Sequence, residues 1–285
     1  MFLNVLANEN MKLFKRRLFW AEIIFLGLIV LGILLALFIT VETNRNGSGL
    51  LSDERQMMLE TLSWPQAWSN VIRFVGWDGF GPIFLMILVG AVTAQEYTWR
   101  TQQLSLSRGI SRRMLLMAKL AALFIAGLLF ILTILVVGGG ATAIFSLLLN
   151  GSLQLPYLDL SHLLFSILRA AYTMLPYGCL VFFLAVASRS AVVATGGGLV
   201  ISLMLENMII SGAGLLGDKA SQIVQYLPGG LSNSLLALNN ASLGTGSSSD
   251  MSLVSPLHAS IGLAAWIVLF IGLSLWFFQR QDLVE

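Results

Sequence analysis

Long apolar runs separated by short polar segments dominate the pattern of the sequence. The runs lie at about residues 21–40, 79–95, 115–148, 163–187, 191–212 and 257–278. A helix needs about 20 apolar residues to cross a bilayer core about 30 Å thick. The pattern therefore predicts an all-α polytopic membrane protein, in which one domain covers residues 1–285 and contains six transmembrane helices. Long apolar runs without strict alternation exclude a transmembrane β-barrel.

Two runs carry potential breaks. The third run is longer than a span needs and contains Gly138, Gly139 and Gly140, so we expect a kink or a break there. The fourth run contains Pro176, which a membrane helix tolerates because neighbouring helices can satisfy the freed backbone groups.

Residues 1–20 predict a cytoplasmic interfacial helix, since the first 17 residues divide into two sides at helical spacing. The apolar side holds Phe2, Leu3, Leu6, Leu13 and Phe14, and the polar side holds Glu9, Lys12 and Arg16.

Composition supports a membrane protein. Hydrophobic residues make up 57% of the chain and charged residues only 11%, whereas about 25% is usual in soluble domains. Mean hydropathy is +0.85. The net charge of +2 provides no field that would attract nucleic acid. The single cysteine, Cys179, cannot form an internal disulfide.

The distribution of lysine and arginine predicts the orientation. With both termini in the cytoplasm, eleven basic residues fall on the inner side and four on the outer side, which is the usual bias for that orientation. We expect a multi-pass protein of the cytoplasmic (cell) membrane. The outer four are Arg45, Arg55, Arg73 and Lys219. We therefore expect extracytoplasmic loops at 41–78 and 213–256. In the second, apolar patches on either side of Pro228, Gly229 and Gly230 predict two short helices at the outer surface.

Residues that commonly carry catalysis are scarce. His162 and His258 are the only histidines, and no HExxH zinc motif occurs. The stretch "GAGLLGDK" at 212–219 fails as a phosphate loop because Asp218 separates the glycine from Lys219. We expect a chain that is not an enzyme, with no catalytic residue, no metal site and no cofactor of its own.

The polar stretch 95–119, "QEYTWRTQQLSLSRGISRRMLLMAK", lies between two apolar runs. Glu96 and Arg100 have the i, i+4 spacing of a helical ion pair, Gly109 indicates a turn, and Ser111 is suited to cap the next helix. This helix–turn–helix pattern favours a docking site for a partner at 96–114. The alternative is that the charges only set topology and attract anionic lipid.

The same stretch resembles the cytoplasmic loop of ABC-2-type ABC transporter permeases, and is most similar to the subgroup labelled multi-copper enzyme maturation permease. The resemblance extends to "YLPGGLSNSLLAL" at 226–238 and "FQRQDL" at 278–283, so it covers nearly the whole chain. Arg100 and Gly109 depart from the glycine and proline that the family commonly has there. Proline should accordingly be tolerated at position 109.

The resemblance implies the membrane-spanning permease subunit of an exporter that moves a hydrophobic or amphipathic substrate. ATP and Mg would bind a separate cytoplasmic ABC ATPase, and the permease would form a homodimer or a heterodimer with a second permease. The loop residues expected to couple to the ATPase are Glu96, Tyr97, Arg100, Thr101, Ser107, Arg108, Gly109, Arg112, Arg113 and Lys119. In the outer loop the resemblance rests on Tyr226, Pro228 and Gly229. The alternatives are a non-transporting immunity or sensor component and an ion-coupled secondary transporter.

Arg169 and Glu206 are the only ionisable residues well inside the predicted spans. Spans four and five form a hairpin around residue 189, and the two positions lie at nearly the same distance from this turn. A charge in a span is costly without a partner. The spacing therefore predicts an intramembrane ion pair between Arg169 and Glu206.

Overall fold

The computed structural model describes residues 2–43, 59, 62, 66–77, 79–99, 107, 109–150, 160–212, 218–242 and 254–281. In this part of the chain all regular structure is helical. The elements are α1 (Phe2–Phe14), α2 (Arg17–Thr43), α4 (Gln66–Val75), α5 (Phe80–Thr98), α7 (Arg112–Asn150), α8 (Leu160–Ser188), α9 (Ala191–Leu199), a π-helix η1 (Val200–Leu205), α10 (Glu206–Gly212), α11 (Asp218–Val224), α12 (Pro228–Ser242) and α13 (Pro256–Arg280).

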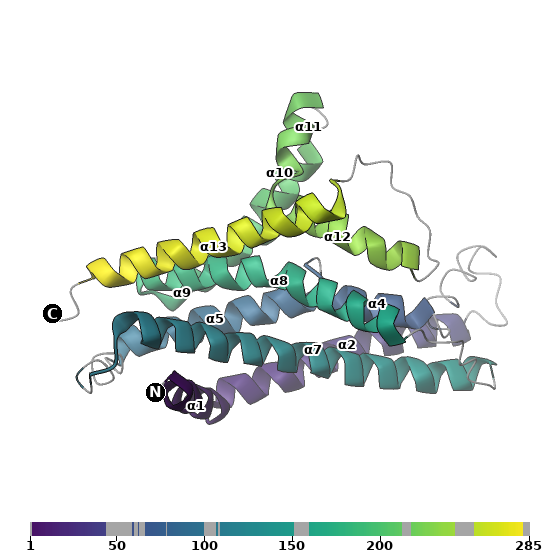
Figure 1. The fold of residues 1–285 in the computed structure, drawn as a ribbon. Helices are drawn as coiled ribbons and strands as arrows, with labels where there is room; N and C mark the ends of the chain where they lie inside the picture. Colours follow the sequence, from purple (N-terminus) through teal and green to yellow (C-terminus); the bar gives the residue numbers. More distant parts are fainter. Residues whose placement is uncertain are drawn as a thin grey trace.

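The six predicted spans are confirmed. The described residues contain six helical stretches that are long and apolar enough to cross a membrane: Arg17–Thr43, Asn70–Thr98, Arg112–Leu149, Ser161–Ser188, Ala191–Gly212 and Pro256–Arg280. They form an elongated bundle, and both chain ends lie at the same end of it (Figure 1). We call this the terminal end and the opposite one the far end.

The bundle is built around α5, most of whose residues are buried. Helices α2, α7, α8 and α9 all pack against α5, and α13 packs on α8. Large apolar side chains remain exposed on the outside of the bundle, among them Phe25 on α2, Leu132 on α7 and Val268 on α13. In a membrane-spanning chain this surface faces lipid, which needs no polar cover.

Of the kink or break expected at the three glycines, the break is wrong, because helix α7 is continuous from Arg112 to Asn150. Two of these glycines lie against α4 instead. A Cβ atom on Gly138 would lie 2.9 Å from a Val71 methyl carbon, and one on Gly139 would lie 2.7 Å from the Trp68 ring. The glycines therefore allow α4 to approach α7 closely. In α8, Pro176 lies within a continuous helix, as expected.

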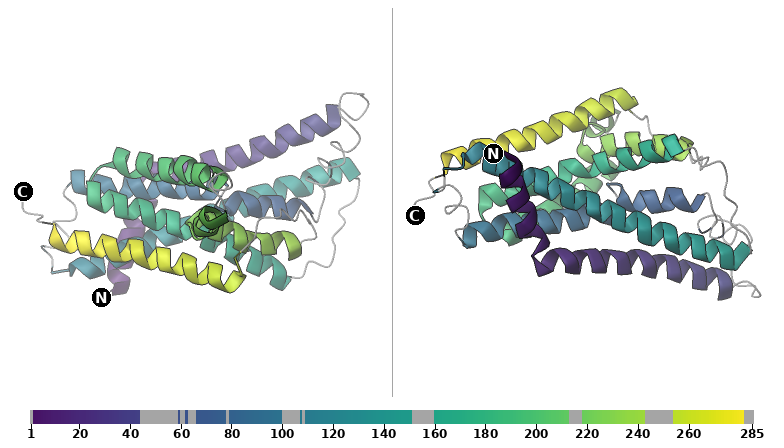
Figure 2. Two further views of the ribbon diagram at one scale, coloured as in Figure 1. Left: turned by 90° about the horizontal axis from the view of Figure 1, so that it is seen from above. Right: turned by 60° about the horizontal axis from the view of Figure 1, so that its bottom comes forward.

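Helix α1 lies across the terminal end of the bundle and packs against α7 (Figure 2). The interfacial helix was predicted, but its bounds and its packed face differ. The chain turns at residues 15 and 16, and α2 begins at Arg17. The buried face holds Val5, Glu9 and Leu13, whereas Leu3 is exposed. Glu9 can be buried because it forms an ion pair with Lys12.

Two helices from the expected extracytoplasmic segments pack into the bundle. Helix α4 contacts α7 and α8, and α12 contacts α13 and α8. The sequence predicted two short helices on either side of the Pro-Gly-Gly motif, and two helices, α11 and α12, are present, although the motif itself forms the first turn of α12. Their placement at the outer surface stays a prediction. The sequence did not predict α4. The fifth span changes from α-helix to π-helix at Val200, and beyond it α10 and α11 project from the bundle (Figure 1).

Candidate functional site

A buried ion-pair network joins three segments at the terminal end. Glu96, on the last turn of α5, pairs with Lys119 of α7, and both side chains are almost completely buried. Arg16, between α1 and α2, lies 3.7 Å from the other Glu96 oxygen and donates a 2.7 Å hydrogen bond to Gln95. Because one carboxylate receives two cations from separate elements, the network fixes the ends of α2, α5 and α7 relative to one another.

Arg112 ties the start of α7 to the end of α13. Its Nη1 atom donates to the backbone carbonyls of Phe278, Gln279 and Gln281 at 3.3, 3.0 and 2.9 Å. These carbonyls lie at a helix C-terminus, where they lack partners within the helix and where a cation is favoured. Gln281 also donates to the Val186 carbonyl at 2.6 Å, which links α13 to α8.

The predicted coupling residues separate into two groups. Glu96, Tyr97, Arg112 and Lys119 make contacts within the chain: Tyr97 donates a 3.2 Å hydrogen bond to Gln281, and the others belong to the contacts above. Ser107, Gly109 and Arg113 are exposed. Arg100, Thr101 and Arg108 lie outside the described residues, so the expected Glu96–Arg100 pair does too.

The expected turn is present at Gly109, which has a φ of +80°. Proline is fixed near a φ of −65°, so the expectation that proline would be tolerated at 109 is wrong for this chain. Ser111 caps the next helix as predicted, since its hydroxyl accepts from the Met114 amide at 3.4 Å.

The structure does not bring Arg169 and Glu206 together. Arg169 donates to Ser166 at 3.3 Å, whereas Glu206 is bound by Tyr177, eight residues further along α8. Eight residues correspond to about 12 Å of helix. A π-helical segment lies just before Glu206, and because its i→i+5 bonds place more residues in each turn, it rotates Glu206 away from the direction that a uniform α-helix would give.

Glu206 lies in a buried polar site formed with the outer-loop motif. Its carboxylate accepts a 2.9 Å hydrogen bond from the Tyr177 hydroxyl and another from the Gly229 amide in the first turn of α12. The Trp77 ring stacks on Tyr177 with centroids 6.3 Å apart, and its indole N–H donates to Asn233 at 2.8 Å. The carboxylate thus binds at a helix N-terminus, where negative charge is stabilised.

The motif "YLPGG" therefore has a structural role at each of the positions that carried the resemblance. Pro228 is the first residue of α12, where its missing N–H costs no hydrogen bond. Gly229 holds Glu206, and the Tyr226 carbonyl accepts from Trp266 of α13 at 3.0 Å. Trp77 and Tyr177 were not predicted as part of a site, because their only signal in the sequence is that each is an aromatic residue next to or within a predicted span.

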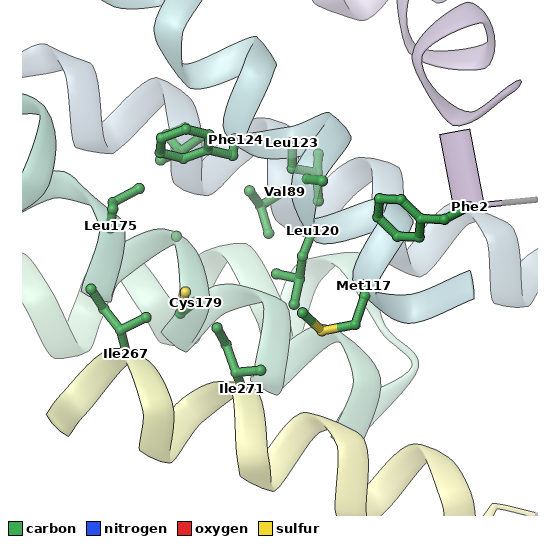
Figure 3. Close-up of a pocket in the computed structure, with 13 residues that line it drawn as sticks. Phe2, Val89, Met117, Leu120, Leu123, Phe124, Leu175, Cys179, Ile267 and Ile271 are labelled. Carbon is green, nitrogen blue, oxygen red and sulfur yellow. The ribbon is translucent and has the colours of Figure 1, made fainter. Parts of the chain in front are cut away.

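An apolar cavity of about 310 Å³ opens between α5, α7, α8 and α13 (Figure 3). Phe2 of α1 also contributes to this cavity. The lining of the cavity contains no charged side chain. The lining residues are Phe2, Leu85, Val89, Met117, Leu120, Ala121, Leu123, Phe124, Leu175, Gly178, Cys179, Ile267 and Ile271. Such a cavity can hold an apolar group the size of part of a lipid or drug molecule.

The described residues contain no group of three or more His, Cys, Asp and Glu side chains that could hold a metal ion. What they contain is a six-span bundle with an apolar cavity, a buried acid and an ordered turn at the terminal end.

Comparison with known families agrees with this architecture. A search of curated proteins finds no match for the sequence. The model of the family described as ABC-2 family transporter protein matches residues 3–283. Since this match spans nearly the whole chain, the protein belongs to the ABC-2 family of transporter proteins and is a multi-pass membrane transport permease.

Proposed function

We propose that the chain is the membrane-spanning subunit of an ATP-driven exporter in the cytoplasmic membrane, which moves a hydrophobic or amphipathic substrate. ATP and Mg bind a separate cytoplasmic ABC ATPase, and two permease chains, identical or different, form the complete transmembrane unit. Family membership supports the transport role, and the apolar cavity is the observation that supports the class of substrate.

The lining of the apolar cavity favours an apolar occupant. It is lined by side chains of the four helices and of Phe2 at the start of α1, and no charge lines it. A sugar or an ion would leave its polar groups unpaired there, at a cost of several kcal/mol for each buried group (about 2–7). A lipid chain or a drug-sized apolar group loses no hydrogen bond on entering.

The exposed turn around Gly109 is the proposed docking point for the ATPase. Force applied there reaches α7 directly, because Ser111 and Arg112 begin that helix. A movement of α7 would also move the end of α13 through Arg112, and α5 through the Glu96–Lys119 pair. Three of the helices that line the apolar cavity would therefore move together when the ATPase subunits close.

Co-expression with the cognate ATPase tests this function. The two subunits should copurify, the purified permease alone should hydrolyse no ATP, and ATPase activity of the complex in lipid vesicles should rise when the apolar substrate is added. ATP hydrolysis that never responds to any apolar compound would favour a non-transporting role instead.

Arg113→Glu tests the docking point, because Arg113 is exposed beside the turn whereas Arg112 also holds α13. The variant should insert normally and lose copurification with the ATPase. The matched control is Lys219→Glu on α11, an exposed charge reversal elsewhere in the chain. Equal copurification of both variants would exclude this turn as the docking point.

A further inference from the structure

A second cavity, of about 510 Å³, lies where α1 meets α2 beside the end of α5. We call it the basic cavity, because four of its eight lining side chains are cationic. The lining residues are Lys12, Lys15, Arg16, Arg17, Leu18, Gln95, Glu96 and Trp99. The apolar cavity shares none of these residues.

The charge of the basic cavity is not balanced within the described chain. Glu9 pairs with Lys12, and Glu96 pairs more closely with Lys119 than with Arg16. Lys15 and Arg17 are exposed and form no ion pair with any described carboxylate. The cavity therefore presents a surplus of positive charge that an anion would neutralise.

The surface of α2 next to the cavity indicates what kind of molecule carries that anion. Arg17 begins a stripe along the outside of α2 that continues with Trp20, Ile24 and Leu28, at spacings of three, four and four residues. These three apolar side chains are 53%, 61% and 59% exposed. The spacing keeps them on one face of the helix. A molecule with an anionic head at Arg17 and an apolar chain along α2 fits this surface.

Two tryptophans beside the basic cavity indicate its position along the membrane normal. Trp99 is 61% exposed, and the Arg16 guanidinium lies 5.6 Å from its ring centroid. Trp20 donates to the Phe14 carbonyl at 2.8 Å, which holds its ring beside the α1–α2 turn. Tryptophan is enriched at membrane–water interfaces, so the cavity lies at the level of lipid headgroups.

We propose that the basic cavity binds the phosphate headgroup of an anionic phospholipid from the leaflet at the terminal end, with one acyl chain along Trp20, Ile24 and Leu28. Arginine and lysine bind phosphate oxygens through charge-assisted hydrogen bonds. Basic pockets between membrane helices are suited to anionic headgroups. The bound lipid would hold α1 against the bundle, next to the Glu96 network. A protein partner would use the same charges but would have no use for the apolar stripe on α2.

Lipid retention by the purified full-length chain tests the proposal. The chain is reconstituted in nanodiscs of equal parts phosphatidylglycerol and phosphatidylcholine and transferred to detergent, and native mass spectrometry then counts the retained lipids. We expect preferential retention of phosphatidylglycerol. The double variant Lys15→Ala/Arg17→Ala should retain it at least tenfold less, with phosphatidylcholine unchanged. Both side chains are exposed and have no ion-pair partner in the described chain, so folding should not suffer.

The matched control is Arg113→Ala/Arg280→Ala, which removes two exposed charges from the same end but none from the cavity. It should keep its phosphatidylglycerol within twofold. Equal losses in the two double variants would overturn the proposal, since the attraction would then be unspecific.

Two further measurements distinguish the lipid from other possible occupants of the basic cavity. Inorganic phosphate at millimolar concentration should not displace the lipid, because phosphate lacks the acyl chain; complete displacement would show a site for free phosphate and overturn the lipid assignment. If Lys15→Ala/Arg17→Ala keeps its lipid but no longer copurifies with the ATPase, the cavity is a protein interface and the proposal is wrong.

Discussion

Two buried glutamates near the terminal end differ in whether they have partners. Glu96 has Lys119 and Arg16, whereas neither carboxylate oxygen of Glu22 has a hydrogen-bond partner in the described chain. Removing one partner of a buried ion pair leaves the other charge uncompensated and costs about 3–5 kcal/mol. Removing an unpartnered carboxylate has no such cost.

We therefore expect Glu96→Gln to lower the free energy of unfolding by about 3 kcal/mol. Glu22→Gln, a matched change at a similarly buried position, should leave it unchanged or raise it. Denaturant unfolding in detergent micelles measures both. If the two variants unfold at the same denaturant concentration, the Glu96 network does not stabilise the fold.

Gly229 is closely packed between Glu206 and Trp77. A Cβ atom there would lie 3.0 Å from Glu206 Oε1 and 3.0 Å from the Trp77 ring. Gly229→Ala should push the carboxylate away from the start of α12 and cost about 1–3 kcal/mol, as overpacking in a core does.

The control for Gly229→Ala is Gly212→Ala, since a Cβ atom at Gly212 has no neighbour within 4 Å among the described residues. The midpoint of thermal unfolding should fall for the first variant only. An unchanged midpoint for Gly229→Ala would mean that the carboxylate and the ring can move aside freely.

Whether a feature of a single residue could be predicted depends on how far apart the interacting residues lie in the sequence. The turn at Gly109 and the cap at Ser111 were predicted, because each depends on neighbouring residues. The partners of Glu206 were not, because Tyr177 and Gly229 lie 29 and 23 residues away. The predicted pairing with Arg169 assumed uniform α-helices, but the segment between the turn and Glu206 contains a π-helix.

At the scale of elements, the packing of α4 on α7 depends on Gly139. An added Cβ atom would lie 2.7 Å from Trp68, a ring held within α4. Gly139→Ala should therefore separate the two helices and destabilise the protein by about 1–3 kcal/mol. Gly140→Ala is the neighbouring control, because its Cβ atom would meet no described residue within 4 Å.

Gly140→Ala should even stabilise the protein slightly, since alanine favours a helix interior over glycine by about 1 kcal/mol. Thermal unfolding of the two variants side by side makes the comparison. Similar destabilisation by both would indicate that backbone flexibility at the three glycines matters, and not the contact with α4.

Helix α4 shows which elements a search for apolar runs misses. Its buried residues Ala67, Val71, Ile72 and Val75 recur at helical spacing, but polar residues such as Asn70 and Arg73 interrupt the run. The 3.6-residue period was present in the sequence and would have identified the helix. The glycines of α7 were interpreted as a kink or a break because the helix that packs on them had not been recognised.

For the whole molecule, composition and run length were sufficient to predict six spans, because lipid requires each span to satisfy its own backbone. The arrangement of the helices around α5 was not predictable in this way. It depends on contacts such as Arg112 with the end of α13, which join residues more than 160 positions apart.

Orientation is the property of the whole molecule that the charges predict. Lysine and arginine near span ends remain on the cytoplasmic side during insertion, and the predicted topology assigns eleven of them to the side of the chain termini and four to the other. The terminal end should therefore face the cytoplasm. Cysteine labelling can measure this, since the single native Cys179 is buried. Exposed test positions are Lys15 and Arg113 at the terminal end and Thr43 and Leu257 at the far end.

With a membrane-impermeant maleimide on intact cells, Thr43→Cys and Leu257→Cys should react, whereas Lys15→Cys and Arg113→Cys should react only after permeabilisation. The unsubstituted chain, with Cys179 alone, is the control for background labelling. Labelling of Lys15→Cys and Arg113→Cys in intact cells would show that the molecule has the opposite orientation in the membrane. The basic cavity and the Gly109 turn would then face away from ATP, and the proposed coupling to a cytoplasmic ATPase would be impossible.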